Sequence, residues 1–368
     1  MSDALSSSLI MRLSRRSLLG AGLFVGTSLL IKGCNTSTET TSSSAAKGQL
    51  TVTTYGGSWE EGHRTELAGS FAQQHSADVK VISEPGLEAV SKVIAAKQNP
   101  PYDVVLIPEG PMFMAADEGV LEAFSPDLSQ HYANILPQYH NQGLAPMVAS
   151  QVLGIAYNPE KISTPPTSLR DLWNPEYRDR VGLASIESGL GTTFLVELAR
   201  LEGGGEDDVE GAFRKLAELR PNLAAVAPNP GALATLLQQG EIDIAPHWFD
   251  YISGIKAKGA TVDWIAPTDK VASSSSSLQV VKNAQSGREL AVAYVDQALS
   301  LEVQTAMAQP PYNFLPTHKD APVPEELAAK LGKKTMAELS DVLFIPNWQI
   351  INQNRAAWIE RFNKEVKI

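Results

Sequence analysis

The chain has 368 residues, of which 43% are hydrophobic and 19% are charged, a composition typical of globular proteins and a length sufficient for two domains. Its formal net charge of −11 predicts an acidic surface, which argues against nucleic acid as a partner. Because Cys34 is the only cysteine, the sequence excludes an internal disulfide bond.

The N-terminus, residues 1–33, has the pattern of an export signal. Arg12, Arg15 and Arg16 precede an uncharged stretch, 17–31, which at about 15 residues is shorter than the roughly 20 that a membrane-spanning helix needs. The motif SRRSLL within it resembles a twin-arginine export signal. A Sec signal that carries two incidental arginines is the alternative.

The motif IKGC, which ends at Cys34, resembles a lipobox, in which a small residue before a lone cysteine marks cleavage and lipid attachment. Lys32 departs from the small or hydroxyl residue that is usual at its position. A polar segment, 34–47, follows, and a lipid-anchored domain needs such a flexible tether. We therefore expect an exported protein, periplasmic or anchored through Cys34 to the outer face of a bacterial membrane, with no other membrane contact.

From residue 49 onward, short apolar strands alternate with amphipathic helices, which predicts an α/β fold with mostly parallel sheets. The first predicted strands are 49–55, 78–83 and 102–108. The stretch YGGSWEE, which begins at Tyr55, connects the first strand to a helix. Ser58 and Glu61 have the spacing of a capping box, so we expect the helix to begin near Ser58 with these two side chains as its cap.

A second set of strands follows, and two long helices, 192–202 and 231–239, lie between its members. The predicted strands are 152–157, 180–185, 223–227, 242–248 and 262–267. The serine run 273–277 precedes a further strand, so we expect the serines in a loop or at a strand start that faces a cleft. We expect the two sets of strands to form two lobes. At the strand after the serine run the chain returns to the first lobe, so it crosses between the lobes twice, and two such crossings form a hinge.

Several motifs resemble the extracellular solute-binding proteins of ABC importers, in the group typified by spermidine/putrescine-binding proteins. They are YGGSWEE, YDVVLIPEGP, LGIAYNPEKI, PPTSLRDLWNPEYRDRVGLAS, LQQGEIDIAPHWFDY and NWQIINQNRAAWIERFNKEV. The resemblance covers 48–368, and PPTSLRDLWNPEYRDRV is its most specific part.

The resemblance implies a two-lobed, type II periplasmic-binding fold, in which each lobe is a mostly parallel sheet flanked by helices and a two-segment hinge joins the lobes. The expected boundaries are 48–146 plus 272–318 for lobe one and 147–271 plus 319–368 for lobe two. The implied function is capture of a small solute and its delivery to a membrane permease by a monomer. No enzyme activity, cofactor or metal is implied.

The resemblance also implies that ligand is held at the rims of both lobes, by aromatic rings and carboxylates in polyamine-binding relatives. The candidate residues are Tyr55, Ser58, Trp59, Glu109, Ser276, Ser277 and Tyr312 in lobe one, and Glu187, Trp248, Asp250 and Tyr251 in lobe two. Trp248 is the foremost candidate, with a core tryptophan as the alternative. Asp250 is alternatively a helix cap, and Tyr312 a packed residue in a proline turn.

Two departures from the polyamine-binding pattern leave the identity of the ligand undecided. The second-lobe segment SIESGLGTT offers only Glu187 as an acid, and serines stand where those relatives place a tryptophan and an aspartate. An unpaired buried ammonium is costly. Ser275, Ser276 and Ser277 with Thr192 would instead suit a carboxylate, so an amino-acid derivative or an opine-like ligand competes with a polyamine.

Two other functions compete with solute capture. A ferric-iron-binding protein of the same fold typically carries adjacent tyrosines, and the 9 tyrosines here include no such pair. An exported hydrolase is the alternative from another class, but the 6 histidines form no HExxH motif and no G-x-S-x-G motif is present.

Overall fold

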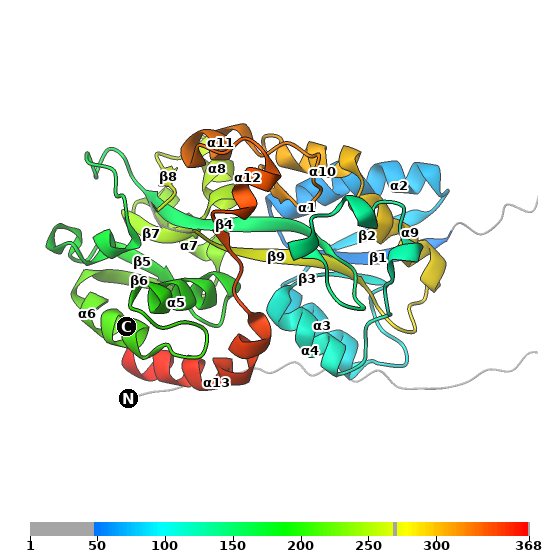
Figure 1. Ribbon diagram of the computed structural model, residues 1–368, viewed down its shortest axis with the longest axis horizontal. Coiled ribbons are helices and arrows are strands. Elements are labelled where there is room, and N and C mark those ends of the chain that lie inside the picture. Colours follow the sequence, from blue (N-terminus) through cyan, green and yellow to red (C-terminus); the bar gives the residue numbers. More distant parts are fainter. Residues whose placement is uncertain (1–47, 268–270, 367–368) are drawn as a thin grey trace, which may run out of the picture. The chain divides into compact units, whose positions relative to one another are not determined.

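The computed structural model describes residues 48–267 and 271–366 (Figure 1). The predicted export signal, the tether and the predicted lipidation site Cys34 lie outside the described residues. Within the described ranges, no helix combines the length and the apolar composition needed to cross a membrane.

The strands follow the predicted order along the chain. They are β1 Gln49–Thr54, β2 Asp78–Ser83, β3 Val104–Pro108, β4 Met147–Tyr157, β5 Val181–Ala184, β6 Leu223–Ala227, β7 Ile244–Trp248, β8 Asp263–Ile265, β9 Val271–Val280, β10 Leu315–Pro316 and β11 Leu343–Phe344. They pair in the order β2-β1-β3-β9-β4-β7-β5-β6, with β8 and β10 beside β4 and β11 beside β9. The apolar sequence of β3, VVLIP, suits a strand covered on both faces.

Two long strands, β4 and β9, join the two halves of this arrangement. One part of β4, Met147–Val152, pairs with β9, and the rest, Leu153–Tyr157, pairs with β7. Strand β9 runs antiparallel to both β3 and β4, whereas β1 pairs in parallel with β2 and β3. We call the elements packed on β1, β2 and β3 lobe one, and those packed on β5, β6 and β7 lobe two.

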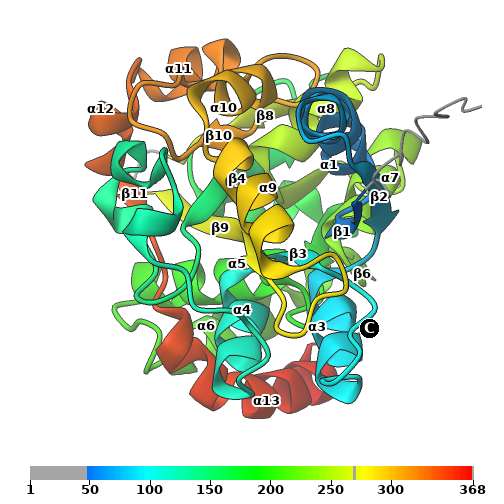
Figure 2. The ribbon, with the colours of Figure 1, turned by 90° about the vertical axis from the view of Figure 1, so that its right-hand side faces the viewer.

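Helices cover both sides of the sheet in each lobe; Figures 1 and 2 show α10 and α11 on one side and α3, α4 and α13 on the other. The helices of lobe one are α1 Ser58–Gly62, the π-helix η1 His63–Ala68, α2 Gly69–Gln74, α3 Gly86–Ala95, α4 Glu109–Asp117, α9 Arg288–Ala298 and α10 Leu301–Ala308. Those of lobe two are α5 Gly189–Leu201, α6 Glu210–Leu219, α7 Pro230–Gln239 and α8 Phe249–Ala257. The C-terminal helices are α11 Glu325–Leu331, α12 Met336–Ser340 and α13 Trp348–Glu365.

Short 3-10 helices lie in the connections between these elements. They are Pro126–Leu128, Tyr132–Asn134, Pro137–Tyr139, Leu169–Trp173, Pro175–Tyr177 and Arg220–Asn222. The C-terminal helix α13 buries Ile351, Trp358 and Phe362 on one face.

Two local predictions are wrong. The first helix does begin at Ser58, but no side chain caps it, since Gly57 at a φ of 72° is the N-cap and the Gly57 carbonyl accepts a hydrogen bond from the Glu61 amide at 3.0 Å. The serine run is neither a loop nor a strand start, because Ser273–Ser277 occupies the middle of β9. Strands β3 and β4 flank β9 on its two sides, and all five serines are buried.

Candidate functional site

The segments that follow β1, β3 and β7 carry most of the predicted ligand-binding residues. Strands β1 and β3 are parallel, so Tyr55 and Glu109, which come directly after them, lie at the same edge of lobe one. In lobe two, β7 ends at Trp248, and the first turn of α8 then carries Asp250 and Tyr251. Ligands of open α/β sheets bind at such carboxyl ends of strands.

Glu109 is a buried carboxylate, 4% exposed, at the start of α4. Its Oε1 accepts a hydrogen bond from the Ser275 amide at 2.7 Å, and its Oε2 accepts one from the Ser274 hydroxyl at 3.0 Å. Burial raises the pKa of Glu109 to about 7, although these hydrogen bonds lower it. Both partners are neutral, so the charge of Glu109 is not balanced by a cation in the described part of the chain.

Asp250 is the corresponding buried carboxylate of lobe two, 2% exposed. The amide nitrogen of Gln151, on β4, donates to its two oxygens at 3.0 and 2.8 Å. Burial raises the pKa of Asp250 to about 7, against the lowering effect of Gln151. The indole of Trp59 also lies close enough to lower this pKa, but its buried Nε1 forms no hydrogen bond of normal geometry with any described residue.

Two tyrosines connect the acids of the two lobes. The hydroxyl of Tyr55 shares a hydrogen bond of 3.0 Å with that of Ser276. Burial raises the pKa of Tyr55 well above its usual range, and the nearby charges of Tyr251 and Glu109 add to the rise. Burial likewise raises the pKa of Tyr251, with a further contribution from Asp250. These couplings bring Tyr55, Glu109, Gln151, Asp250 and Tyr251 into one group, which we call the interlobe cluster.

The serines of β9 position this cluster. Ser274 and Ser275 hold Glu109, and the hydroxyl of Ser275 donates to that of Ser150 at 3.2 Å. Ser276 holds Tyr55, whereas Ser277 donates to the sulfur of Met112 at 3.4 Å. The hydroxyls expected to face ligand are therefore engaged with neighbouring protein groups.

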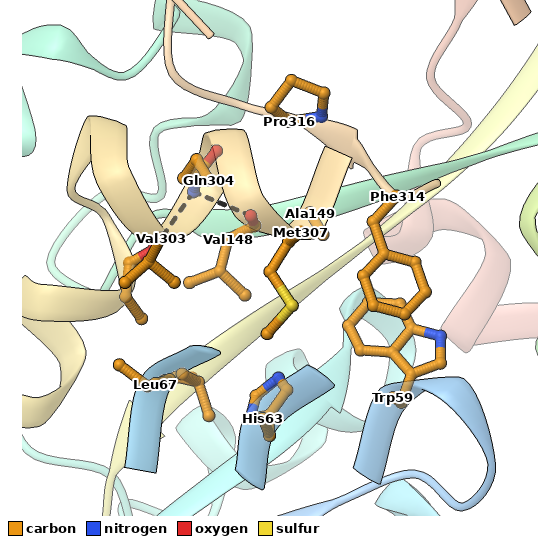
Figure 3. A pocket seen from close by; sticks show the side chains of 12 residues that line it. Trp59, His63, Leu67, Val148, Ala149, Val303, Gln304, Met307, Phe314 and Pro316 are labelled. Carbon is orange, nitrogen blue, oxygen red and sulfur yellow. Dashed lines mark hydrogen bonds between the residues drawn. The ribbon is translucent and has the colours of Figure 1, made fainter. Parts of the chain in front are cut away.

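Trp59 packs inside lobe one, 1% exposed. Its ring stacks on Phe314 with a centroid distance of 4.1 Å and meets Tyr55 edge-on at 5.2 Å. Figure 3 shows Trp59 beside His63 and Met307, with which it lines a cavity of about 20 Å³, enough for about one water molecule. Ser58, one residue earlier, is half-buried at the start of α1.

Three other predicted residues, Trp248, Tyr312 and Glu187, make their contacts with residues outside the interlobe cluster. Trp248, 2% exposed, is opposite Leu153 of β4 and belongs to the hydrophobic core. The Tyr312 hydroxyl donates to Glu66 at 3.3 Å, and the exposed Glu187 carboxylate accepts from Asn363 at 3.2 Å. Their roles in binding stay predictions.

Sequence reasoning missed Gln151, the residue that holds Asp250. It is a half-buried residue within β4, whose sequence MVASQVLGIAY is otherwise apolar or small around it. A long amide side chain in such a strand is the signal that would have identified it, because a buried polar group needs a partner.

Comparison with known proteins identifies a matching family. The family described as bacterial extracellular solute-binding protein matches residues 99–354. Among curated proteins no match was found.

Solved structures share the fold across nearly the whole chain. An ABC transporter substrate-binding protein from Bradyrhizobium japonicum has a TM-score of 0.73 and 19% identity over 87% of this chain and 100% of its own. MotA from A. tumefaciens B6, in complex with glucopine, has a TM-score of 0.71 and 18% identity over 86% and 99%. The spermidine/putrescine ABC transporter substrate-binding protein PotD from Streptococcus pneumoniae has a TM-score of 0.65 and 18% identity over 86% and 99%.

These likenesses confirm the predicted two-lobed, type II periplasmic-binding fold. The family match covers more than half of the chain. The chain belongs to the family of bacterial extracellular solute-binding proteins.

Proposed function

We propose that this protein is the substrate-binding component of an ABC importer, and that its solute carries an ammonium group, as a polyamine or a related amine or amino-acid derivative does. The observation that carries the proposal is the pair of buried carboxylates, Glu109 in lobe one and Asp250 in lobe two, whose hydrogen-bond partners are all neutral. A buried charge is costly unless an opposite charge pairs with it. A cationic solute would supply that opposite charge.

Closure follows from the placement of the two acids on different lobes. A cation that contacts Glu109 and Asp250 together interacts more favourably with the closed arrangement than with an open one, so it shifts the population toward the closed form. A membrane permease would then distinguish loaded from empty protein by this closed form. In this way the two carboxylates couple capture of the solute to its delivery.

Aromatic rings support the choice of an amine. Tyr55 and Tyr251 belong to the interlobe cluster and are each half-buried. A ring face contributes about 0.5 to 2 kcal/mol to the binding of an ammonium group. The serine hydroxyls proposed from sequence as a carboxylate site are engaged with Glu109, Ser150 and Tyr55, which favours a ligand with cationic ends over a purely anionic one.

A ferric-iron-binding protein is the second candidate, favoured by one observation. The cluster combines two phenols, Tyr55 and Tyr251, with two carboxylates, Glu109 and Asp250, and hard oxygen donors suit a hard cation. The tyrosines are far apart in the sequence, so the absence of an adjacent pair does not exclude this donor set. Iron content and visible absorbance of the purified protein distinguish the two candidates.

The N-terminal predictions complete the proposal. The segment 1–33 would direct export, by the twin-arginine route, and Cys34 would carry the lipid that keeps the protein near its permease. We propose that the protein acts as a monomer and performs no chemistry on its solute.

A thermal-shift panel tests the proposed function. It compares polyamines, amino acids, opines, thiamine, sugar phosphates and ferric ion, because a specific ligand raises the melting temperature by mass action. We expect the largest rise from a compound with at least one ammonium group. A largest rise from ferric ion, together with bound iron in the purified protein, would favour the second candidate, and a largest rise from a purely anionic compound would contradict both.

A further inference from the structure

Helix α13 contacts both lobes. In Figure 1 it runs beneath α5 and α6 of lobe two, and its first turns reach α4 of lobe one. Its contacts with the two lobes differ in kind, and both include backbone groups beside predicted ligand-binding residues.

The contact with lobe one is made at Gly110, the residue after Glu109. The Asn352 side-chain amide donates to the Gly110 carbonyl at 2.9 Å. The ring of Trp348 lies so close that a Cβ atom at Gly110 would be 2.9 Å from two of its carbons. Trp348 is 2% exposed, and its Nε1 has no hydrogen-bond partner among the described residues. The absence of a side chain at Gly110 is therefore what lets α13 approach α4.

The contact with lobe two is made by long side chains further along the helix. Arg355 donates to the Glu187 carbonyl at 2.6 Å and to the Thr192 hydroxyl at 3.2 Å. Further along α13, Arg361 pairs with Glu210 at 2.5 Å and lies over the ring of Phe213, 4.2 Å from its centroid. Residues 355–363 of the helix thus reach α5 and α6 through long side chains, whereas its first turns pack directly on α4 of lobe one.

Asn352 and Arg355 lie one turn apart on the same face of α13. They link the carbonyl beside Glu109 in lobe one to the carbonyl of Glu187 in lobe two. We propose that α13 moves with lobe two and that Trp348 and Asn352 form a latch, which docks on Gly110 when the lobes close and so holds Glu109 at the interlobe cluster. Trp348 and Asn352 are then positioning residues that need not contact the solute.

The latch rests on the proposed function in one respect, that closing of the lobes captures a solute. Small-angle X-ray scattering, with and without the compound that raises the melting temperature most, compares the wild type with Asn352→Ala and Gly110→Ala. The first variant removes the hydrogen bond, and the second places a methyl group against Trp348.

The control is Asn354→Ala, an exposed position on α13 whose amide donates only to the Ile350 carbonyl of the same helix. Alanine favours a helix over glycine, so Gly110→Ala should not unfold α4. The melting temperature of each variant checks that it remains folded.

With that compound present, we expect Asn352→Ala and Gly110→Ala to have a larger radius of gyration than the wild type, because loss of the docking contact destabilises the closed form, and Asn354→Ala to match the wild type. Unchanged scattering in both test variants would overturn the latch, as would an equal increase in the control. If the compound that stabilises the wild type most is not an amine, the proposed solute is contradicted and this comparison is unaffected.

Discussion

The side-chain amide of Gln151 lies between the two oxygens of Asp250, 3.0 Å from one and 2.8 Å from the other. Gln151 is on β4, the strand shared by both lobes, and Asp250 is in the first turn of α8. A neutral donor offsets only part of the cost of burying a carboxylate, which is why the pKa of Asp250 rises to about 7. The ligand-free protein therefore carries an acid that a cation would stabilise.

Asp250→Asn should make the ligand-free protein more stable at pH 8. The substitution removes a buried negative charge and keeps an amide oxygen that Gln151 can bond. We expect the melting temperature to rise by about 2 °C or more, which for a protein of this size corresponds to about 1 kcal/mol. Glu241→Gln, at an exposed carboxylate, should leave it unchanged. A lower melting temperature for Asp250→Asn would show that the charge is already compensated.

The affinity for an amine should rise with pH between 5 and 8. The pKa values of Glu109 and Asp250 are both raised to about 7, so at pH 5 both carboxyls are protonated and neither can pair with an ammonium group. Below pH 7, the affinity should fall about tenfold per pH unit for each carboxyl that must ionise. Calorimetry in buffers of different ionisation enthalpy should detect the released protons. An affinity that is constant from pH 5 to 8 would contradict this expectation.

Stability should show opposing contributions from acids and histidines. Burial raises the pKa values of Glu109 and Asp250. Protonation of these two carboxyls therefore favours the folded state at low pH, and this contribution to stability is lost as pH rises toward 7. Burial lowers the pKa values of His63 and His247 to about 4, so their contribution is lost as pH falls from 6.5 toward 4.

The double variant Glu109→Gln with Asp250→Asn separates these contributions. Its melting temperature should rise with pH between 4 and 6.5, more steeply than that of the wild type, because only the histidine contribution remains. A profile parallel to that of the wild type would show that the two carboxyls do not titrate as described.

Truncation of Trp248 should mainly lower stability, whereas truncation of Tyr251 should mainly lower the affinity for an amine. Trp248 belongs to the hydrophobic core, so Trp248→Ala should lower the free energy of unfolding by about 3 kcal/mol or more. Tyr251 is half-buried, and Tyr251→Ala should cost much less stability yet lower amine affinity at least tenfold, about 1.4 kcal/mol. Chemical denaturation and calorimetric titration measure the two quantities. Wild-type affinity in Tyr251→Ala would show that this ring does not contribute to binding of the amine.

The sequence allowed prediction of features that depend on near neighbours. The apolar strand YDVVLIP ends just before Glu109, and this is enough to place that carboxylate at a sheet edge. The partners of Glu109 could not be predicted, because Ser274 is 165 residues away in the sequence and meets it only through the pairing of β9 with β3. The predicted loop at the serine run is wrong for the same reason, since its polarity indicates a loop and only its place between two strands explains its burial.

The most direct measurement is calorimetric titration, at pH 7.5, of the amine that stabilises the wild type most. It compares the wild type with Asp250→Asn, Glu109→Gln and the exposed control Glu241→Gln. In the proposed binding mode the two carboxylates pair with the ammonium group from opposite lobes, so each cluster variant should bind at least tenfold more weakly and the control should match the wild type. Equal affinity in all four proteins would contradict the claim that Glu109 and Asp250 form the binding site.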